Sequence, residues 1–273
     1  MELDKDTMGQ LSTLFGNVLG DYYNYYGKDI VNVECTLSNK LSDTFMEKRP
    51  DYFEGDVKTT PEAIDINRGT IIPPIELDGK FMIVINSNYF LDSLQKKDYQ
   101  WTGTLIHELT HVLDFIQYAK INHLDSYDVI QRDMEHRPFM LWTECNARAK
   151  GYFFIRKYVF GDKVNDKYDT DQTDYILQTE LPYQINVFAN GYSEVADNSW
   201  QQMYVATQFL GRYSIWEELF PNVFTKSLRR QVMGTNQWVM DLYLFFLNNR
   251  ELETANQNWK EMLEIMRSNW KGI

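Results

Sequence analysis

A long segment with helical character, residues 99–119, contains two histidines four positions apart with a glutamate between them. The string from His107 to His111 is H-E-L-T-H, which has the pattern H-E-x-x-H. Residues four apart share one face of an α-helix, so both imidazoles can bind one metal ion. Two imidazoles, a carboxylate and a water molecule are typical ligands of catalytic zinc. We therefore expect His107 and His111 to bind Zn2+ and Glu108 to act as general base on the water.

The residues around the motif predict a helix with two different faces. One stripe at helical spacing is apolar and contains Trp101, Leu105, Leu109, Val112 and Ile116. A second stripe is polar and contains Thr104, His107, His111, Asp114 and Tyr118. A helix with an apolar back and a histidine-rich front is typical of the wall of a cleft.

A zinc ion also needs a third protein ligand, and two carboxylates are candidates. Asp114 lies seven residues after His107, a distance of about 10.5 Å along a helix, so one ion cannot easily bind both. We expect Asp114 to orient an imidazole, or else to be a plain surface carboxylate. Glu144 lies in a second predicted helix, 139–160, where a buried carboxylate needs a cationic partner. We predict Glu144 as the third ligand; the alternative is an ion pair with Arg148 on an exposed helix.

The two other histidines, His123 and His136, lie in the polar connector between these helices. Their spacing does not match a ligand pattern. We therefore expect both side chains on the surface, with a ligand role as the alternative.

The motif together with Glu144 on a following helix resembles the gluzincin-type zinc metallopeptidases. The string H-E-L-T-H is similar to that of thermolysin, and the longer gap to Glu144 is more like that of the clostridial neurotoxin light chains and anthrax lethal factor. The resemblance covers about residues 78–160 and rests on few fixed positions, so it indicates the group and not a subfamily. It implies a zincin-like fold, a strand above the metal helix, and a zinc ion held by His107, His111 and Glu144.

The chain departs from this family pattern at one position. Thermolysin-like sequences have an aspartate four residues after the ligand glutamate, where it supports a ligand histidine, and this chain has Arg148 there. That support must come from elsewhere, and Asp114 is the candidate. We assign Arg148 as the residue that stabilises the transition state, with one of the tyrosines as an equal alternative.

The region before the motif has mixed character. The predicted elements are a helix at 7–26 and strands at 30–37, 63–66, 70–72 and 81–86. Asp78-Gly79 is a tight-turn signal, which predicts a hairpin between Ile75–Leu77 and Phe81–Ile85. We expect Phe81–Asn86 to be an edge strand that pairs with an extended peptide; the alternative is an ordinary sheet strand.

The chain after residue 160 has mostly helical patterns. Residues 161–171 are the best candidate linker, and helices are predicted at 173–190, 198–211, 213–220, 225–249 and 254–270. The predicted fold class is α+β, with a small mixed sheet, an edge strand over the metal helix and a helical C-terminal lobe. The predicted division is a catalytic region, 1–160, and a helical lobe, 161–273, within one domain or two.

Composition limits the partners and the location. The net charge of −12 argues against a nucleic-acid partner, and no apolar run is long enough for a membrane span. The first 20 residues lack the basic start and apolar core of a signal peptide, which favours the cytoplasm or export by a signal-independent route. Cys35 and Cys145 are the only cysteines, and we expect both to be reduced and buried.

The leading hypothesis is zinc-dependent hydrolysis of a peptide or protein substrate, with Glu108 as general base. One alternative is a zincin-fold binding or regulatory protein, such as a phage-borne module, with little or no peptidase activity. Another is a structural helix-rich protein in which the motif arose by chance. For a chain with four histidines, such a chance occurrence has a frequency of roughly half a per cent.

Overall fold

The computed structural model describes residues 5–29, 31–53, 60–234 and 236–269. The chain divides into two compact units, Met1–Arg132 and Asp133–Ile273. Helix α7 (Arg137–Phe160) packs on α10 (Ser199–Leu219) within the second unit. A separation into independently folding domains stays a prediction.

The first unit contains a three-stranded mixed sheet, which confirms the α+β class. Its strands are β1 (Val33–Ser38), β2 (Gly69–Ile72) and β3 (Phe81–Asn86), arranged in the order β1–β3–β2. Strand β1 is parallel to β3, and β2 is antiparallel to β3. Five of the six β3 residues are buried, as expected for a strand that is paired on both edges and covered on both faces.

The expectation that Phe81–Asn86 is an edge strand is wrong. Val84 pairs with Thr36 of β1 on one side and with Thr70 of β2 on the other. Both rows of main-chain groups in β3 are therefore used within the sheet, and a peptide cannot pair with this strand.

Two further expectations for this region are also wrong. The antiparallel partner of β3 is β2, so Ile75–Leu77 forms no hairpin with it. The predicted strand at 63–66 is replaced by helix α3 (Pro61–Asp65). The Thr60 side chain accepts a hydrogen bond from the Ala63 amide, and Pro61 occupies the first turn, so both residues favour a helix start here.

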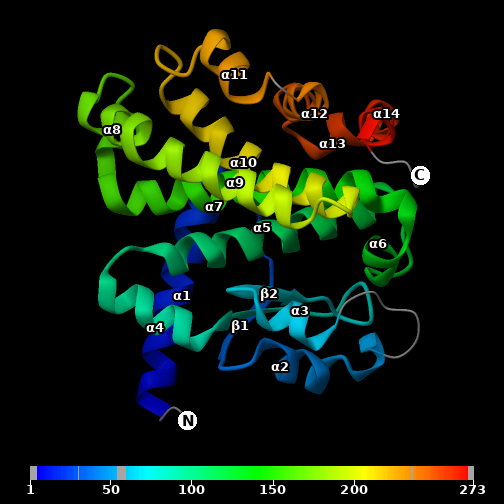
Figure 1. Cartoon of the computed structure of the whole chain (residues 1–273). Helices are drawn as coiled ribbons and strands as arrows, with labels where there is room; N and C mark the ends of the chain where they lie inside the picture. The colour runs from blue at the N-terminus through cyan, green and yellow to red at the C-terminus, as the bar shows by residue number, and fades with distance from the viewer. Residues whose placement is uncertain (1–4, 30, 54–59, 235, 270–273) are drawn as a thin grey trace. The chain divides into compact units, whose positions relative to one another are not determined.

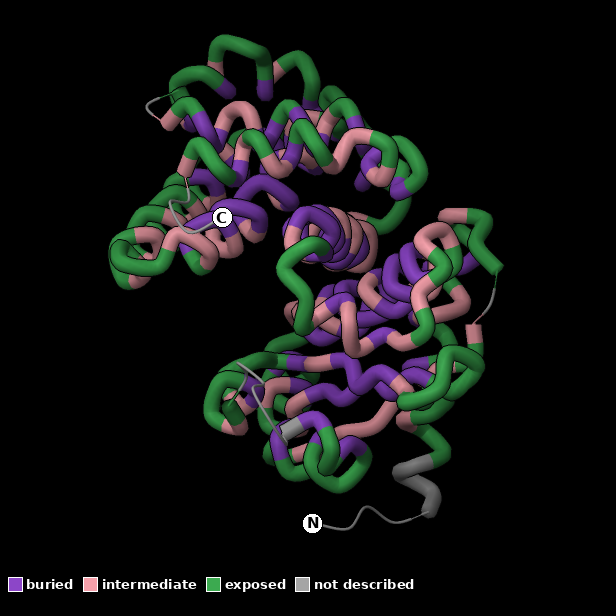
Figure 2. The backbone as a smooth tube through the Cα atoms, turned by 90° about the vertical axis from the view of Figure 1, so that its right-hand side faces the viewer, coloured by how far each residue is buried: buried purple, intermediate pink, exposed green. Residues whose placement is uncertain are grey.

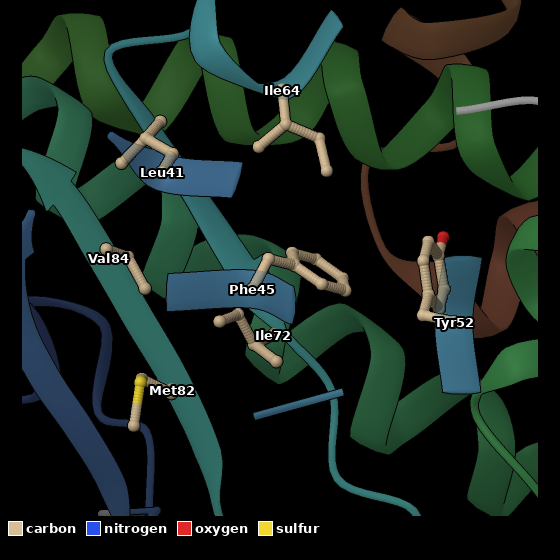
Figure 3. Packing of buried hydrophobic residues seen from close by; sticks show 7 residues of the cluster. All are labelled: Leu41, Phe45, Tyr52, Ile64, Ile72, Met82 and Val84. Atoms are coloured by element: carbon tan, nitrogen blue, oxygen red, sulfur yellow. The ribbon is translucent and has the colours of Figure 1, made fainter. Parts of the chain in front are cut away.

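Helices cover both faces of the sheet (Figure 1). Helices α2 (Leu41–Lys48) and α3 pack on one face, and α5 (Gln100–Ile121) packs on the other. Figure 3 shows the first of these layers, a buried cluster of Leu41, Phe45, Tyr52, Ile64, Ile72, Met82 and Val84. Side chains alternate between the two faces along a strand, so Met82 and Val84 of β3 lie on the same face of the sheet and both join this cluster.

The start of α5 packs against two other helices of the first unit. Helix α1 (Lys5–Tyr26), helix α4 (Ser87–Lys96) and the start of α5 meet at three aromatic rings. Phe90 lies 5.7 Å from Phe15 and 5.2 Å from Trp101, measured between ring centroids. Beyond the other end of α5, a short helix, α6 (Asp128–Arg132), is tied to the turn η1 (Pro50–Phe53) through Arg49.

The described residues of the second unit form helices joined by turns, in agreement with the predicted helical C-terminal lobe. Besides α7 and α10 it contains η2 (Met134–His136), η3 (Gly161–Asn165), α8 (Thr170–Tyr175), the π-helical segment η4 (Ile176–Glu180), α9 (Leu181–Glu194), α11 (Lys226–Met233), α12 (Gln237–Asn248), α13 (Leu252–Gln257) and α14 (Trp259–Asn269). The predicted helices 198–211 and 213–220 are one helix, α10, whereas 225–249 is two, α11 and α12.

Helices α7 and α10 lie unusually close together. A Cβ atom added at Gly211 would lie 2.6 Å from the carbonyl oxygen of Cys145 and 2.8 Å from the Cβ of Arg148. Only glycine therefore allows this approach. Many residues of α7 and α10 are buried; Figure 2 colours the backbone by burial, with the buried stretches in purple. None of the helices in the described ranges has the length and apolarity needed to cross a membrane.

Candidate metal centre

The two histidines of the motif lie side by side on α5. The Nε2 atoms of His107 and His111 are 3.1 Å apart, and their ring planes are nearly perpendicular at 87°. Two Nε2 atoms at this distance either share a proton or direct their lone pairs at a common cation. Tetrahedral zinc with Zn–N bonds of about 2.0–2.1 Å separates two nitrogen ligands by about 3.3 Å. The imidazole pair therefore fits a zinc ion without rearrangement of the helix.

Glu108 lies beside strand β2. Its side chain is 7% exposed, and its Cγ would lie 3.3 Å from a Cβ added at Gly69. The same added atom would lie 2.9 Å from Thr104 and 3.0 Å from Ile85. The missing side chain of Gly69 therefore allows β2 to approach α5 where the motif lies.

Asp114 is buried, so the alternative of a plain surface carboxylate is wrong. It is 5% exposed and lies near Tyr22 of α1. Burial, and in smaller part the charge of Asp114, raise the pKa of the Tyr22 hydroxyl well above its usual value. The role of Asp114 in orienting an imidazole stays a prediction.

Glu144 is buried on α7, where Arg148 and Tyr204 donate hydrogen bonds to it. It is 2% exposed; Arg148 Nη2 donates to its Oε1 at 3.1 Å, and the Tyr204 hydroxyl donates to its Oε2 at 3.0 Å. The ion pair with Arg148 exists, but on a buried face and not on the exposed helix of the alternative interpretation. An ionised carboxylate has about four acceptor sites, so these two bonds are compatible with a ligand role.

Tyr204 is the residue that the sequence did not reveal. It lies on α10, 60 residues after Glu144, among 18 tyrosines in the chain, and no motif surrounds it. Only the packing of α10 on α7 shows which tyrosine reaches the carboxylate.

The remaining histidines and the cysteines lie in different environments. His123 is exposed, as expected, whereas the expectation of a surface side chain is wrong for His136, which is 6% exposed. Neither cysteine forms a disulfide; Cys145 is buried, and Cys35 is only half-buried. Burial, and then the charge of Glu34, raise the pKa of the Cys35 thiol to about 11.

Comparisons with known proteins identified no relative. No protein-family model matches the chain, and neither the curated proteins nor the solved structures gave a match. The functional argument therefore rests on the residues and their geometry. His107 and His111 belong to the first unit and Glu144 to the second, so their assignment to one ion is a proposal.

Proposed function

We propose that the protein is a zinc-dependent peptidase in which His107, His111 and Glu144 bind one zinc ion. The observation that carries the proposal is the 3.1 Å separation of the two Nε2 atoms within an H-E-x-x-H helix. The three side chains supply a donor set suited to a metal ion. A buried carboxylate such as Glu144 also gains from a nearby cation, because its charge is costly to remove from water.

The chain would contribute the proton transfers. Zinc, when bound, supplies a Lewis acid that makes a water molecule more acidic and polarises the scissile carbonyl. Glu108 accepts the proton of the attacking water and then donates it to the leaving amine. Its position one residue after His107 on the same helix supports this role. Asp114 would hold an imidazole in the orientation that metal binding requires.

An extended substrate would pair with β2, because both edges of β3 are already paired within the sheet. No described strand pairs with the edge of β2 that lies opposite β3. Gly69 at the start of β2 lies next to Glu108, so a peptide on that edge would run close to the base. Main-chain hydrogen bonds to a strand edge are a general way to bind a peptide in extended form. The proposed architecture of the first unit is accordingly zincin-like.

Metal analysis and one substitution test the proposal. Purified protein should contain about one zinc ion per chain, and a peptide library should be cleaved in a reaction that a chelator stops. Glu108→Gln should keep the zinc and lose the cleavage, because the amide cannot accept the proton. Unchanged cleavage by Glu108→Gln would exclude the mechanism.

A metal-binding interaction protein is the second candidate. The Glu144–Arg148 ion pair favours it, because an arginine replaces the aspartate that thermolysin-like peptidases have at this position. The two functions differ in one result. A zinc-loaded chain that cleaves no member of the peptide library would support the interaction protein.

A further inference from the structure

The carboxylate of Glu144 is held from two helices within the second unit. Arg148 approaches from the next turn of α7, and Tyr204 approaches from α10. The two donors bind different oxygens, one bonding Oε1 and the other Oε2. Bonds to both oxygens restrict rotation about the last side-chain torsion, which is otherwise broad for glutamate.

The two contacts differ in what they contribute. The Arg148 guanidinium offsets the charge of a carboxylate that is almost fully removed from water. Its own side chain is 27% exposed, so the cation keeps part of its hydration. The Tyr204 hydroxyl is neutral and mainly contributes direction, since a hydrogen bond is strong only over a narrow range of angles.

We infer that Tyr204 and Arg148 are positioning residues, which hold the Glu144 carboxylate in one orientation for the metal. The inference rests on the proposed zinc centre and changes the role of Arg148, since its guanidinium is engaged with the ligand carboxylate. Residues that orient metal ligands typically change metal affinity by about 10- to 100-fold when they are removed.

Zinc affinity of the full-length chain tests the inference. Competition with a chromogenic chelator should show about 10-fold weaker zinc binding for Tyr204→Phe, which removes only the hydroxyl. Arg148→Gln should weaken binding similarly, and Arg148→Lys should restore part of it. The absorption spectrum of the cobalt-substituted protein should shift for Tyr204→Phe, because it reports the geometry of the ligands.

A second tyrosine on the same helix provides a matched control. Tyr213 is also buried on α10, and its hydroxyl has no hydrogen-bond partner among the described residues. Tyr213→Phe therefore removes the same atom without touching Glu144. It should leave zinc affinity and the cobalt spectrum unchanged.

Each outcome has a defined meaning. If Tyr204 acts through Glu144, Tyr204→Phe should have no further effect on zinc affinity in a Glu144→Ala background. Wild-type affinity and spectrum for Tyr204→Phe, or an equal loss in both backgrounds, would overturn the inference alone. No zinc in the wild-type protein, or wild-type affinity for Glu144→Ala, would overturn the proposed zinc centre and the inference with it.

Discussion

Gly69 in β2 lies against Glu108 in α5, so closely that a methyl group at Gly69 would press on the side chain of the proposed base. The added Cβ would lie 3.3 Å from Glu108 Cγ and 2.9 Å from Thr104 Cγ2. Contacts this short require the side chains of Thr104 and Glu108 to shift, and buried side chains at a close-packed interface have little space to do so.

Gly69→Ala should therefore reduce catalysis more than stability. We expect kcat/KM on a cleaved peptide to fall by roughly 10- to 100-fold, because small displacements of a catalytic group are costly, while zinc content stays at the wild-type level. Gly20→Ala is the control, since a Cβ at Gly20 would meet nothing within 4 Å. Wild-type kcat/KM for Gly69→Ala would contradict this expectation and show that the interface accepts the methyl group without displacing Glu108.

Asp114→Asn should weaken zinc binding without unfolding the protein. The substitution keeps the shape of a buried side chain but removes its charge, so it tests support of an imidazole by a carboxylate. We expect zinc affinity to fall about 10-fold in a chelator competition. Asp125→Asn, at an exposed position, should have no effect. An unchanged zinc affinity for Asp114→Asn would assign the residue a purely structural role.

Arg49→Met should destabilise the first unit. Arg49 is 2% exposed and donates to Asp51, to Asp128 and to the carbonyl oxygen of Pro73. Its loss leaves the mostly buried Asp128 without its closest cation, so we expect the free energy of unfolding to fall by about 3 kcal/mol in a urea titration.

Arg132→Met is the control for this loss. Arg132 also lies near Asp128, at 3.8 Å, but its side chain is 43% exposed. Arg132→Met should lower the free energy of unfolding by less than about 1 kcal/mol, because exposed ion pairs usually contribute no more than that. Equal losses for the two variants would contradict the importance of the buried guanidinium.

The Cys35 thiol should react slowly at moderately alkaline pH. Its pKa of about 11 in the folded protein lies above the ordinary value of 9.0, so at pH 8 the reactive thiolate is about 100-fold rarer than in the unfolded chain. The sign for stability follows from the same shift. The folded state binds this proton more tightly than the unfolded state does. The free energy of unfolding therefore falls as the pH rises from 9 towards 11.

Timed alkylation with iodoacetamide checks this expectation. The Cys35→Ala variant isolates Cys145, whose pKa burial raises well above the ordinary value and which should react more slowly still. Alkylation of folded Cys35 at the rate of the urea-unfolded protein would contradict the expectation.

Local patterns predicted the helices and the imidazole pair well. The apolar stripe of Trp101, Leu105, Leu109 and Val112 is buried as expected. The spacing of His107 and His111 alone placed both rings together, because a helix fixes the relation between residues four apart. Both predictions depend only on residues that lie within one or two helical turns of each other.

Pairing between distant segments was not predictable in the same way. The apolar sequence of Phe81–Ile85 fits a central strand as well as an edge strand. Its partners, β1 and β2, are separate segments of the chain that its own sequence does not specify. The contact of Tyr204 with Glu144 has the same character, because it depends on the close approach of α10 at Gly211. A single sequence carries no local signal for either relationship.

The strand order β1–β3–β2 has a consequence for synthesis of the protein. The strand in the middle is the last of the three to leave the ribosome, and the two earlier strands pair with it and not with each other. A nascent chain that ends before residue 81 therefore contains two strands without a neighbour. The sheet forms only once β3 emerges, immediately ahead of the helices α4 and α5.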